Sequence, residues 1–148
     1  MSDGVDELVG QEFTADGVYE VSRAKIREFA AAVGDSSALC SEVDAARAAG
    51  HADLVAPPTF AVIPAFRGLA EVMGRIGAPL QRQVHGEQGF THHRPIVAGD
   101  ELVTSATAER IRNVGGNLFV TVSCRVSDAA GEPVTTARSV VVVRGDDS

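Results

Sequence analysis

The fold is decided by residues 60–76, which read FAVIPAFRGLAEVMGRI. Their apolar side chains recur at helical spacing and cover much of the circumference, which predicts a helix buried on most sides. Pro64 has no backbone N–H, so we expect it at the start of this helix or within its first turn, where that loss costs little. A helix so apolar requires other elements to enclose it.

The chain after this helix predicts the enclosing sheet. Apolar residues alternate with polar ones from Leu118 to Val126, the period of a strand with one buried face. Sequences typical of tight turns stand at residues 113–117 and 128–131. We therefore expect an α+β fold in which a meander of four long antiparallel strands wraps around the central helix, with strands at residues 81–94, 102–112, 118–126 and 135–144.

Shorter elements are expected before the central helix. An extended piece at residues 17–21 leads to Ser22, a favoured N-cap residue. A second, Ala-rich helix is expected at residues 43–49. A first helix is expected between Ser22 and Gly34, where glycine favours a helix end. Its apolar stripe, at spacing i, i+3, i+4 and i+7, consists of Ile26, Phe29, Ala30 and Val33.

The 148 residues fit a single domain, 1–148, because no repeat or low-complexity linker divides them. We expect residues 1–10 and 145–148 to be loosely held. The net charge of −7 argues against binding to nucleic acid or to an anionic membrane, because both need a basic face.

The sequence also predicts a cytoplasmic protein. The acidic N-terminus is not followed by an apolar run, so no secretory signal is expected. No stretch approaches the roughly 18 consecutive apolar residues that a membrane span requires. Cys40 and Cys124 match no metal or redox spacing, which fits a reducing compartment.

Three segments stand in a distinctive order along nearly the whole chain. They are FAAAVGD at residues 29–35 with AARAAG at 45–50, APPTF at 56–60, and HGEQGF at 85–90 with HRPIVAGD at 93–100. In this order and spacing they resemble the MaoC-like hot-dog dehydratases and hydratases, and within that family its non-catalytic, N-terminal-type half. The resemblance implies a hot-dog fold, an antiparallel sheet wrapped around a central buried helix.

The resemblance implies syn addition or removal of water on (R)-3-hydroxyacyl and trans-2-enoyl thioesters of CoA or acyl carrier protein. Active members carry Asp and His in a motif like D-x-N-P-x-H, with a backbone N–H near the start of the buried helix for the thioester oxygen. Here Asp35 matches the Asp, but Cys40 stands five residues on and the Asn-Pro is missing. A thiol with an ordinary pKa of about 8.5 is mostly neutral at pH 7 and replaces imidazole poorly.

Pro58 is a second departure, because active members have glycine at this position. Proline has no N–H to offer the thioester oxygen, and losing one such donor lowers the rate about 10²–10³-fold. The chain therefore looks like a substrate-shaping subunit that is active only with a catalytic MaoC-like partner. It is similar to the separate partner subunits of mycobacterial fatty-acid dehydratases, and we expect no cofactor or metal.

The resemblance places candidate substrate-binding residues at the start of the central helix and in the third segment. Each has a structural alternative: the helix residues line an acyl tunnel or belong to the core, and Arg94 contacts a pantetheine phosphate or forms an ion pair at a strand end. Asp35 is either a catalytic remnant or a solvated turn residue. The candidates are Pro58, Thr59, Phe60, Val62, Ile63, Phe66, His85, Gly86 and Arg94.

For the cysteines and histidines, structural roles are expected rather than catalytic or metal-binding ones. Cys40 has no nearby basic pattern to lower its pKa, so an inert thiol is expected, and Cys124 is expected in the core. A metal site is not expected: His92 and His93 point to opposite faces of a strand, and His85 lies about 26 Å from His93 by strand rise.

Alternative functions stay open at this point. One is a self-sufficient (R)-specific enoyl-CoA hydratase in which Asp35 works with His51, with His85 or with a histidine of a second protomer. Another is a homodimeric acyl-CoA-binding module. A third is a thioesterase, for which Glu71 is the acidic candidate on the central helix. In each case we expect association, with itself or a homologue, at a strand edge and a helix flank.

Overall fold

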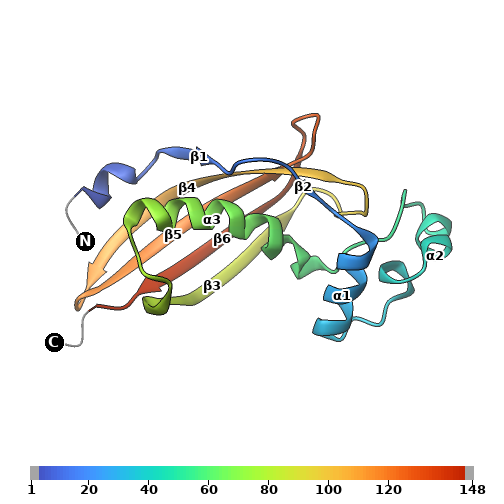
Figure 1. Ribbon diagram of the computed structural model, residues 1–148, viewed down its shortest axis with the longest axis horizontal. Coiled ribbons are helices and arrows are strands. Elements are labelled where there is room, and N and C mark those ends of the chain that lie inside the picture. The colour runs from blue at the N-terminus through green and yellow to red at the C-terminus, as the bar shows by residue number, and fades with distance from the viewer. Residues whose placement is uncertain (1–3, 146–148) are drawn as a thin grey trace.

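The computed structural model describes residues 4–145, and its elements follow the predicted order, with helices first and long strands last (Figure 1). The elements, with η for 3-10 helices, are η1 (Val5–Leu8), β1 (Glu12–Thr14), β2 (Tyr19–Glu20), α1 (Arg23–Val33), η2 (Ala38–Cys40), α2 (Val43–Ala48), η3 (Pro58–Ala61), α3 (Val62–Ile76), η4 (Leu80–Arg82), β3 (Gln83–His92), β4 (Glu101–Val114), β5 (Asn117–Ser127) and β6 (Pro133–Val143).

The strands pair antiparallel in the order β1-β4-β5-β6-β3, and β2 also pairs with β4. The predicted four-strand meander is wrong in one respect, because β3 lies beside β6 and not beside β4. The loop between β3 and β4 crosses the end of the sheet, where the N–H of His93 donates to Val134 O at 2.9 Å and that of Gly99 to Val21 O at 2.8 Å. Alternation identifies strands but not their neighbours.

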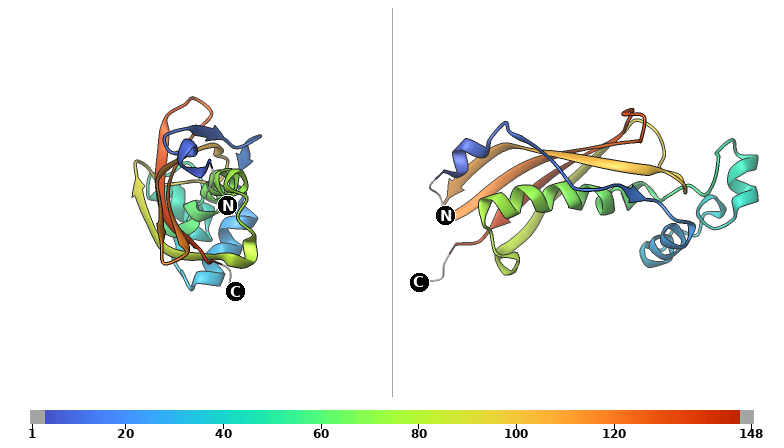
Figure 2. Two further views of the ribbon diagram at one scale, coloured as in Figure 1. Left: turned by 90° about the vertical axis from the view of Figure 1, so that its left-hand side faces the viewer. Right: turned by 45° about the horizontal axis from the view of Figure 1, so that its top comes forward.

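The long helix α3 runs along one face of the sheet and packs on β4 and β5 (Figures 1 and 2). Pro64 is its third residue, within the first turn as expected. The buried side faces the sheet, whereas Phe66 is 54% exposed on the other flank, so burial on most sides is confirmed only for the inner part. The buried helix residues are Pro64, Ala65, Gly68, Leu69, Val72, Met73 and Ile76.

Helices α1 and α2 project beyond one end of the sheet (Figure 2). The Ser22 side chain caps α1 by accepting from the N–H of Lys25 at 3.0 Å, and Gly34 ends it with φ 76°, both as predicted. Ile26 and Ala30 are buried, but Val33 is 51% exposed, so its assignment to the core stripe is wrong. The α1 helix projects past the sheet, and its last turn therefore has little to pack against.

The N-terminal stretch that we expected to be loosely held makes several contacts. Val5 is buried, and the N–H of Gly10 donates to Ala108 O at 3.0 Å, which attaches the chain to β4. Residues 1–3 and 146–148, which belong to the same expectation, lie outside the described residues.

Asp53 ties the segment after α2 to α1 and makes stability depend on acid. Its carboxylate accepts hydrogen bonds from Arg23 at 3.0 and 2.8 Å and from the N–H of Leu54 at 2.8 Å. These hydrogen bonds lower the pKa of Asp53 to about 2, and the bond from Arg23 has the largest effect. Because the pKa is about 3.9 in an unfolded chain, this stabilisation is present at neutral pH and is lost as the pH falls from about 4 to about 2.

We therefore expect Asp53→Asn to lower the urea midpoint of unfolding at neutral pH, and the difference from wild type to shrink as the pH falls toward about 3. Urea titrations followed by circular dichroism measure this difference at each pH. Glu28→Gln, at a more exposed carboxylate paired with Lys25, is the control and should change little. A difference for Asp53→Asn that stays constant across the range contradicts the assignment.

Candidate functional site

A pocket of about 470 Å³ opens where the α1–α2 region meets the start of the central helix and the end of β3. Its walls come from three stretches that are distant in the sequence, and they bring Asp35 and Cys40 together with Pro58 and Arg94. The lining residues are Asp35, Ser37, Leu39, Cys40, Val55, Ala56, Pro57, Pro58, His92, His93, Arg94, Pro95 and Ile96.

Asp35 stands directly after the left-handed Gly34 that ends α1, which turns the chain toward the pocket. Its Oδ1 accepts from the N–H of Ser37 at 3.0 Å, the arrangement of an Asx turn. The carboxylate is half-buried. Asp35 therefore forms a turn, as the structural alternative describes, and it also lines the pocket, so its catalytic role stays a prediction.

Cys40 ends η2 on the wall of the same pocket and is 4% exposed. Burial raises the pKa of its thiol, and the charge of Asp35 and a hydrogen bond to that carboxylate raise it further. The thiol is therefore neutral at physiological pH, as the inert interpretation requires. A neutral thiol beside Asp35 cannot relay a proton as an imidazole does.

The start of the central helix forms the adjoining wall. Pro57 caps η3 and Pro58 is its first residue, so neither position offers a backbone N–H to the pocket. This wall is fixed to the loop after β3, because the N–H of Ala56 donates to Ile96 O at 2.8 Å. Active MaoC-like members bind the thioester oxygen with a backbone amide at this position, and Pro58 has no such amide.

Two histidines that we did not count as site residues line the pocket. The Nδ1 of His92 lies 3.0 Å from the hydroxyl of Thr135, and its ring stacks on Phe90 with centroids 5.6 Å apart. His93 follows at the end of the strand, and both side chains are exposed. The sequence signal was their position in the third segment, where His93 begins HRPIVAGD and His92 directly precedes it. The pocket itself exists only once β3 meets the Asp35 loop.

Arg94 also lines the pocket, but acidic partners engage its guanidinium. It donates to both Asp100 oxygens at 2.9 and 3.1 Å, to Asp128 at 3.3 Å and to Pro95 O at 2.9 Å. These bonds hold the loop that crosses the sheet end. The geometry matches the structural ion pair that we gave as the alternative to a phosphate contact.

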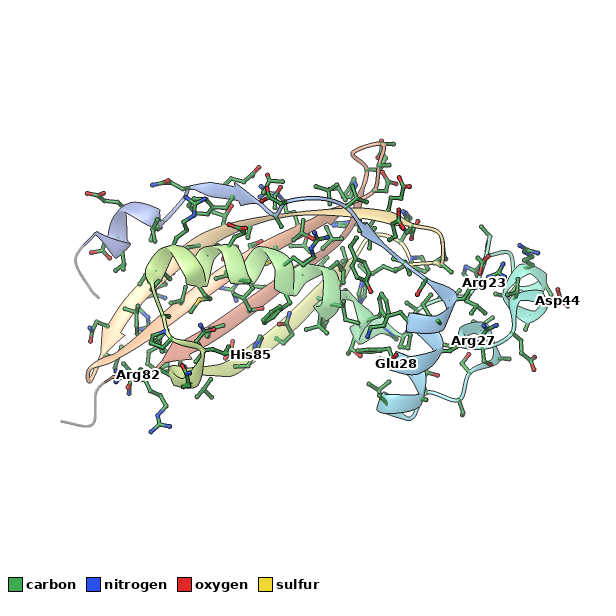
Figure 3. All side chains as sticks on the ribbon, in the orientation of Figure 1. Arg23, Arg27, Glu28, Asp44, Arg82 and His85 are labelled. Carbon is green, nitrogen blue, oxygen red and sulfur yellow. The ribbon has the colours of Figure 1, made fainter. Side chains whose placement is uncertain are left out.

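The other predicted binding residues do not line this pocket. Thr59 is exposed on η3, Phe60 is fully buried, and Val62, Ile63 and Phe66 lie on α3. His85 and Gly86 stand near the other end of β3, as the label of His85 in Figure 3 shows.

The alternative that pairs Asp35 with His51 or His85 of the same chain gains no support from the pocket, since neither histidine lines it. Glu71, the thioesterase candidate, is half-buried on α3 and does not line it either. Within residues 4–145 no group of three or more potential ligands could hold a metal ion, and no helix has the length and hydropathy to cross a membrane.

An antiparallel sheet packed on one long helix, with a pocket at the helix start, defines a hot-dog protein of the MaoC-like dehydratase and hydratase class. The chain belongs to the family described as FAS1-like, dehydratase domain region, which its residues 7–137 match. The predictions of the hot-dog fold and of this wider family are therefore confirmed.

Relatives and solved structures agree with this assignment. A UPF0336 protein of Saccharopolyspora erythraea is 45% identical over 140 residues, which cover 93% of this chain and 90% of the relative. A MaoC-like dehydratase superposes with a TM-score of 0.87 at 35% identity over 97% of this chain, which spans only 44% of that protein. The C-terminally truncated HadBC (3R-hydroxyacyl-ACP dehydratase) complex of Mycobacterium tuberculosis gives a TM-score of 0.83 at 26% identity, covering 91% of this chain and 96% of the matched one.

Proposed function

We propose that this chain is the substrate-shaping, non-catalytic subunit of a heteromeric (R)-3-hydroxyacyl-thioester dehydratase in fatty-acid or related acyl metabolism. The observation that carries the proposal is the pair Asp35 and Cys40 in an intact pocket. The pocket contains the carboxylate of Asp35, but a buried neutral thiol stands where the resemblance implies an imidazole. Pro58 adds a second loss, because it removes an amide donor from the same wall.

One solved structure that this chain resembles along almost its full length supports a heteromeric enzyme. The HadBC protein is a complex that acts as a (3R)-hydroxyacyl-ACP dehydratase. By analogy, this chain pairs with a MaoC-like subunit that carries the complete Asp and His motif. Its ligand is then an acyl thioester of CoA or acyl carrier protein.

The sheet offers a place for that partner. β3 stands at the end of the strand order and, among the described residues, pairs with β6 alone. An unpaired edge of ten residues is a template for another strand. The half-exposed Phe66 flank of α3 lies on the same inner side of the sheet, so a hot-dog partner joined at β3 also covers part of this flank.

The test is reconstitution with a MaoC-like subunit that carries the full D-x-N-P-x-H motif. We expect the pure chain to hydrate neither crotonyl-CoA nor trans-2-dodecenoyl-CoA, and the two proteins to coelute from size exclusion and hydrate the longer substrate faster than the partner alone. Hydration by the pure chain at ordinary enzyme rates would refute the proposal. A stable homodimer that binds acyl-CoA and ignores the partner would favour the binding-module alternative.

The pocket histidines support a second candidate, a self-sufficient hydratase in which Asp35 works with His92 or His93. Asp35→Asn separates the two, because the amide oxygen can still accept from Ser37 and so preserves the turn. In the non-catalytic role, we expect this variant to leave kcat/KM of the complex within about threefold, since an acid or base contributes about 10²–10⁴-fold. A fall of about 10²-fold or more would favour the second candidate.

A further inference from the structure

Three polar side chains form a connected chain on β3 and β6, away from the pocket. The hydroxyl of Ser139, 3% exposed, donates to Gln88 Oε1 at 2.7 Å. The Nε2 of His85 lies 2.8 Å from the same oxygen. Both Gln88 and His85 are exposed, and Figure 3 places His85 in the half of the molecule away from α1 and α2.

These hydrogen bonds fix which nitrogen of His85 carries the proton. The Gln88 amide donates through Nε2 to Gly89 O at 3.2 Å and to Arg138 O at 3.4 Å, so its other terminal atom is the carbonyl oxygen. An oxygen only accepts, and therefore His85 must donate from Nε2. The neutral ring then leaves Nδ1 unprotonated, as a hydrogen-bond acceptor with a fixed direction.

A β-bulge places this acceptor on the inner face of the sheet. The register shifts between His85 and Glu87, so His85 lies opposite Val141 and Gln88 opposite Ser139. Val141 and Ser139 are both buried on the side of α3, and residues opposite each other share a face. Strict alternation would separate two residues three positions apart, so the extra residue, Gly86, brings them together.

Glycine suits the bulge position. A side chain at Gly86 would bring its Cβ to 3.3 Å from Val140 O, a tight contact with backbone. The segment HGEQ at residues 85–88 thus builds the hydrogen-bonded chain of His85, Gln88 and Ser139 as a unit. Gly86 forms the bulge that puts His85 and Gln88 on the same face of the sheet, and Gln88 orients His85.

The same strand is the free edge of the sheet, and α3 packs on β4 and β5 rather than over β3. When two such edges join antiparallel, the beginning of one strand lies against the end of the other. The pocket of this chain lies at the end of its β3. By the same geometry, His85 near the beginning of β3 faces the corresponding pocket of the partner.

We infer that His85 is a substrate-contacting residue of the assembled enzyme, whose Nδ1 accepts a hydrogen bond from the hydroxyl of a 3-hydroxyacyl chain in the partner's pocket. The inference rests on the proposed function for its partner and ligand. The hydroxyl is the donor that distinguishes a 3-hydroxyacyl chain from a saturated one. His85 thus selects among ligands and moves no proton itself.

The first test uses the isolated full-length chain and needs no partner. Long-range ¹H–¹⁵N NMR at alkaline pH, where imidazole is neutral, should show His85 protonated at Nε2 alone. Gln88→Leu should convert His85 to a mixture of tautomers, because the leucine accepts no hydrogen bond. An Nδ1-protonated ring, or a tautomer that Gln88→Leu leaves unchanged, would overturn the claim that Gln88 fixes the tautomer of His85.

The second test measures binding to the complex, with the partner's catalytic histidine replaced so that no turnover occurs. We expect His85→Phe to weaken (3R)-hydroxydodecanoyl-CoA about tenfold, the effect of one lost hydrogen bond. Dodecanoyl-CoA, which has no hydroxyl, should bind as before. His85→Gln, which keeps an acceptor oxygen, should retain most of the preference for the hydroxylated ligand.

Glu87→Gln is the matched control, since Glu87 lies on the opposite face of the same strand, opposite Val140. Equal losses for both ligands, or no loss, with His85→Phe would overturn the substrate contact and leave the proposed function standing. A wild-type chain that forms no complex with the partner would overturn the proposed function and the contact together, while the NMR result stays independent of both.

Discussion

Replacing Phe60 with alanine is expected to lower the free energy of unfolding by about 3–5 kcal/mol. Phe60 is fully buried and lies where three elements meet. Its ring contacts Phe29 of α1 edge to face, with centroids 5.5 Å apart, and Tyr19 of β2 at 6.4 Å. The variant therefore leaves a cavity at the joint between α1 and the start of the central helix, and both transfer energy and aromatic contacts are lost.

Thermal and urea unfolding of the isolated chain measure this cost, with Phe66→Ala as the matched control. Phe66 lies one and a half turns further on, 54% exposed, so its truncation should change stability by less than about 0.5 kcal/mol. If Phe60→Ala instead proves harmless to folding but lowers acyl-CoA binding, Phe60 lines a tunnel, as one sequence interpretation held. Equal losses of stability in Phe60→Ala and Phe66→Ala would contradict the difference in burial between the two side chains.

Gly68→Ala is expected to destabilise the chain by about 1–3 kcal/mol, although alanine is the better helix former. Gly68 faces the sheet where α3 crosses β4 and β5. An added Cβ would lie 2.8 Å from Thr104 Cγ2 and 3.0 Å from Ala106 Cβ, so the helix must move outward. That movement also stretches the hydrogen bond of 2.9 Å from the Thr104 hydroxyl to Pro64 O, which fastens the first turn of α3 to the sheet.

Gly74→Ala on the same helix is the control, because nothing lies within 4 Å of the added Cβ. There the change should be neutral or stabilise by up to about 1 kcal/mol through helix propensity. Melting temperatures of the two variants measured side by side decide the matter. A stabilised Gly68→Ala protein would show that α3 does not approach the sheet so closely.

The sequence predicted elements better than their arrangement. Local signals in the sequence were reliable, and the structure confirms them. They are the helical spacing of apolar residues in α3, the N-cap at Ser22 and the helix end at Gly34. The place of β3 beside β6 depends on a loop that crosses the sheet end, which no alternation pattern encodes. Val33 fits the helical stripe equally well, but α1 extends beyond the sheet that would cover it.

The candidate site was predictable where a motif carried it and not elsewhere. Asp35, Cys40 and Pro58 were found through their spacing in the resembling segments, and they line one pocket. His92 and His93 join them only because β3 ends beside the Asp35 loop in three dimensions. The link between His85 and Gln88 was also hidden, since a strand without a bulge would put them on opposite faces.

The walls of the pocket are held by the main chain. Val55 N–H donates to Leu39 O and Ala56 N–H to Ile96 O, both at 2.8 Å, and neither bond depends on which side chain faces the cavity. The outline of the pocket therefore depends on the same main-chain bonds that hold the fold together, and it tolerates changes of the side chains that line it. A cavity built in this way can accept different ligands when only its lining side chains change.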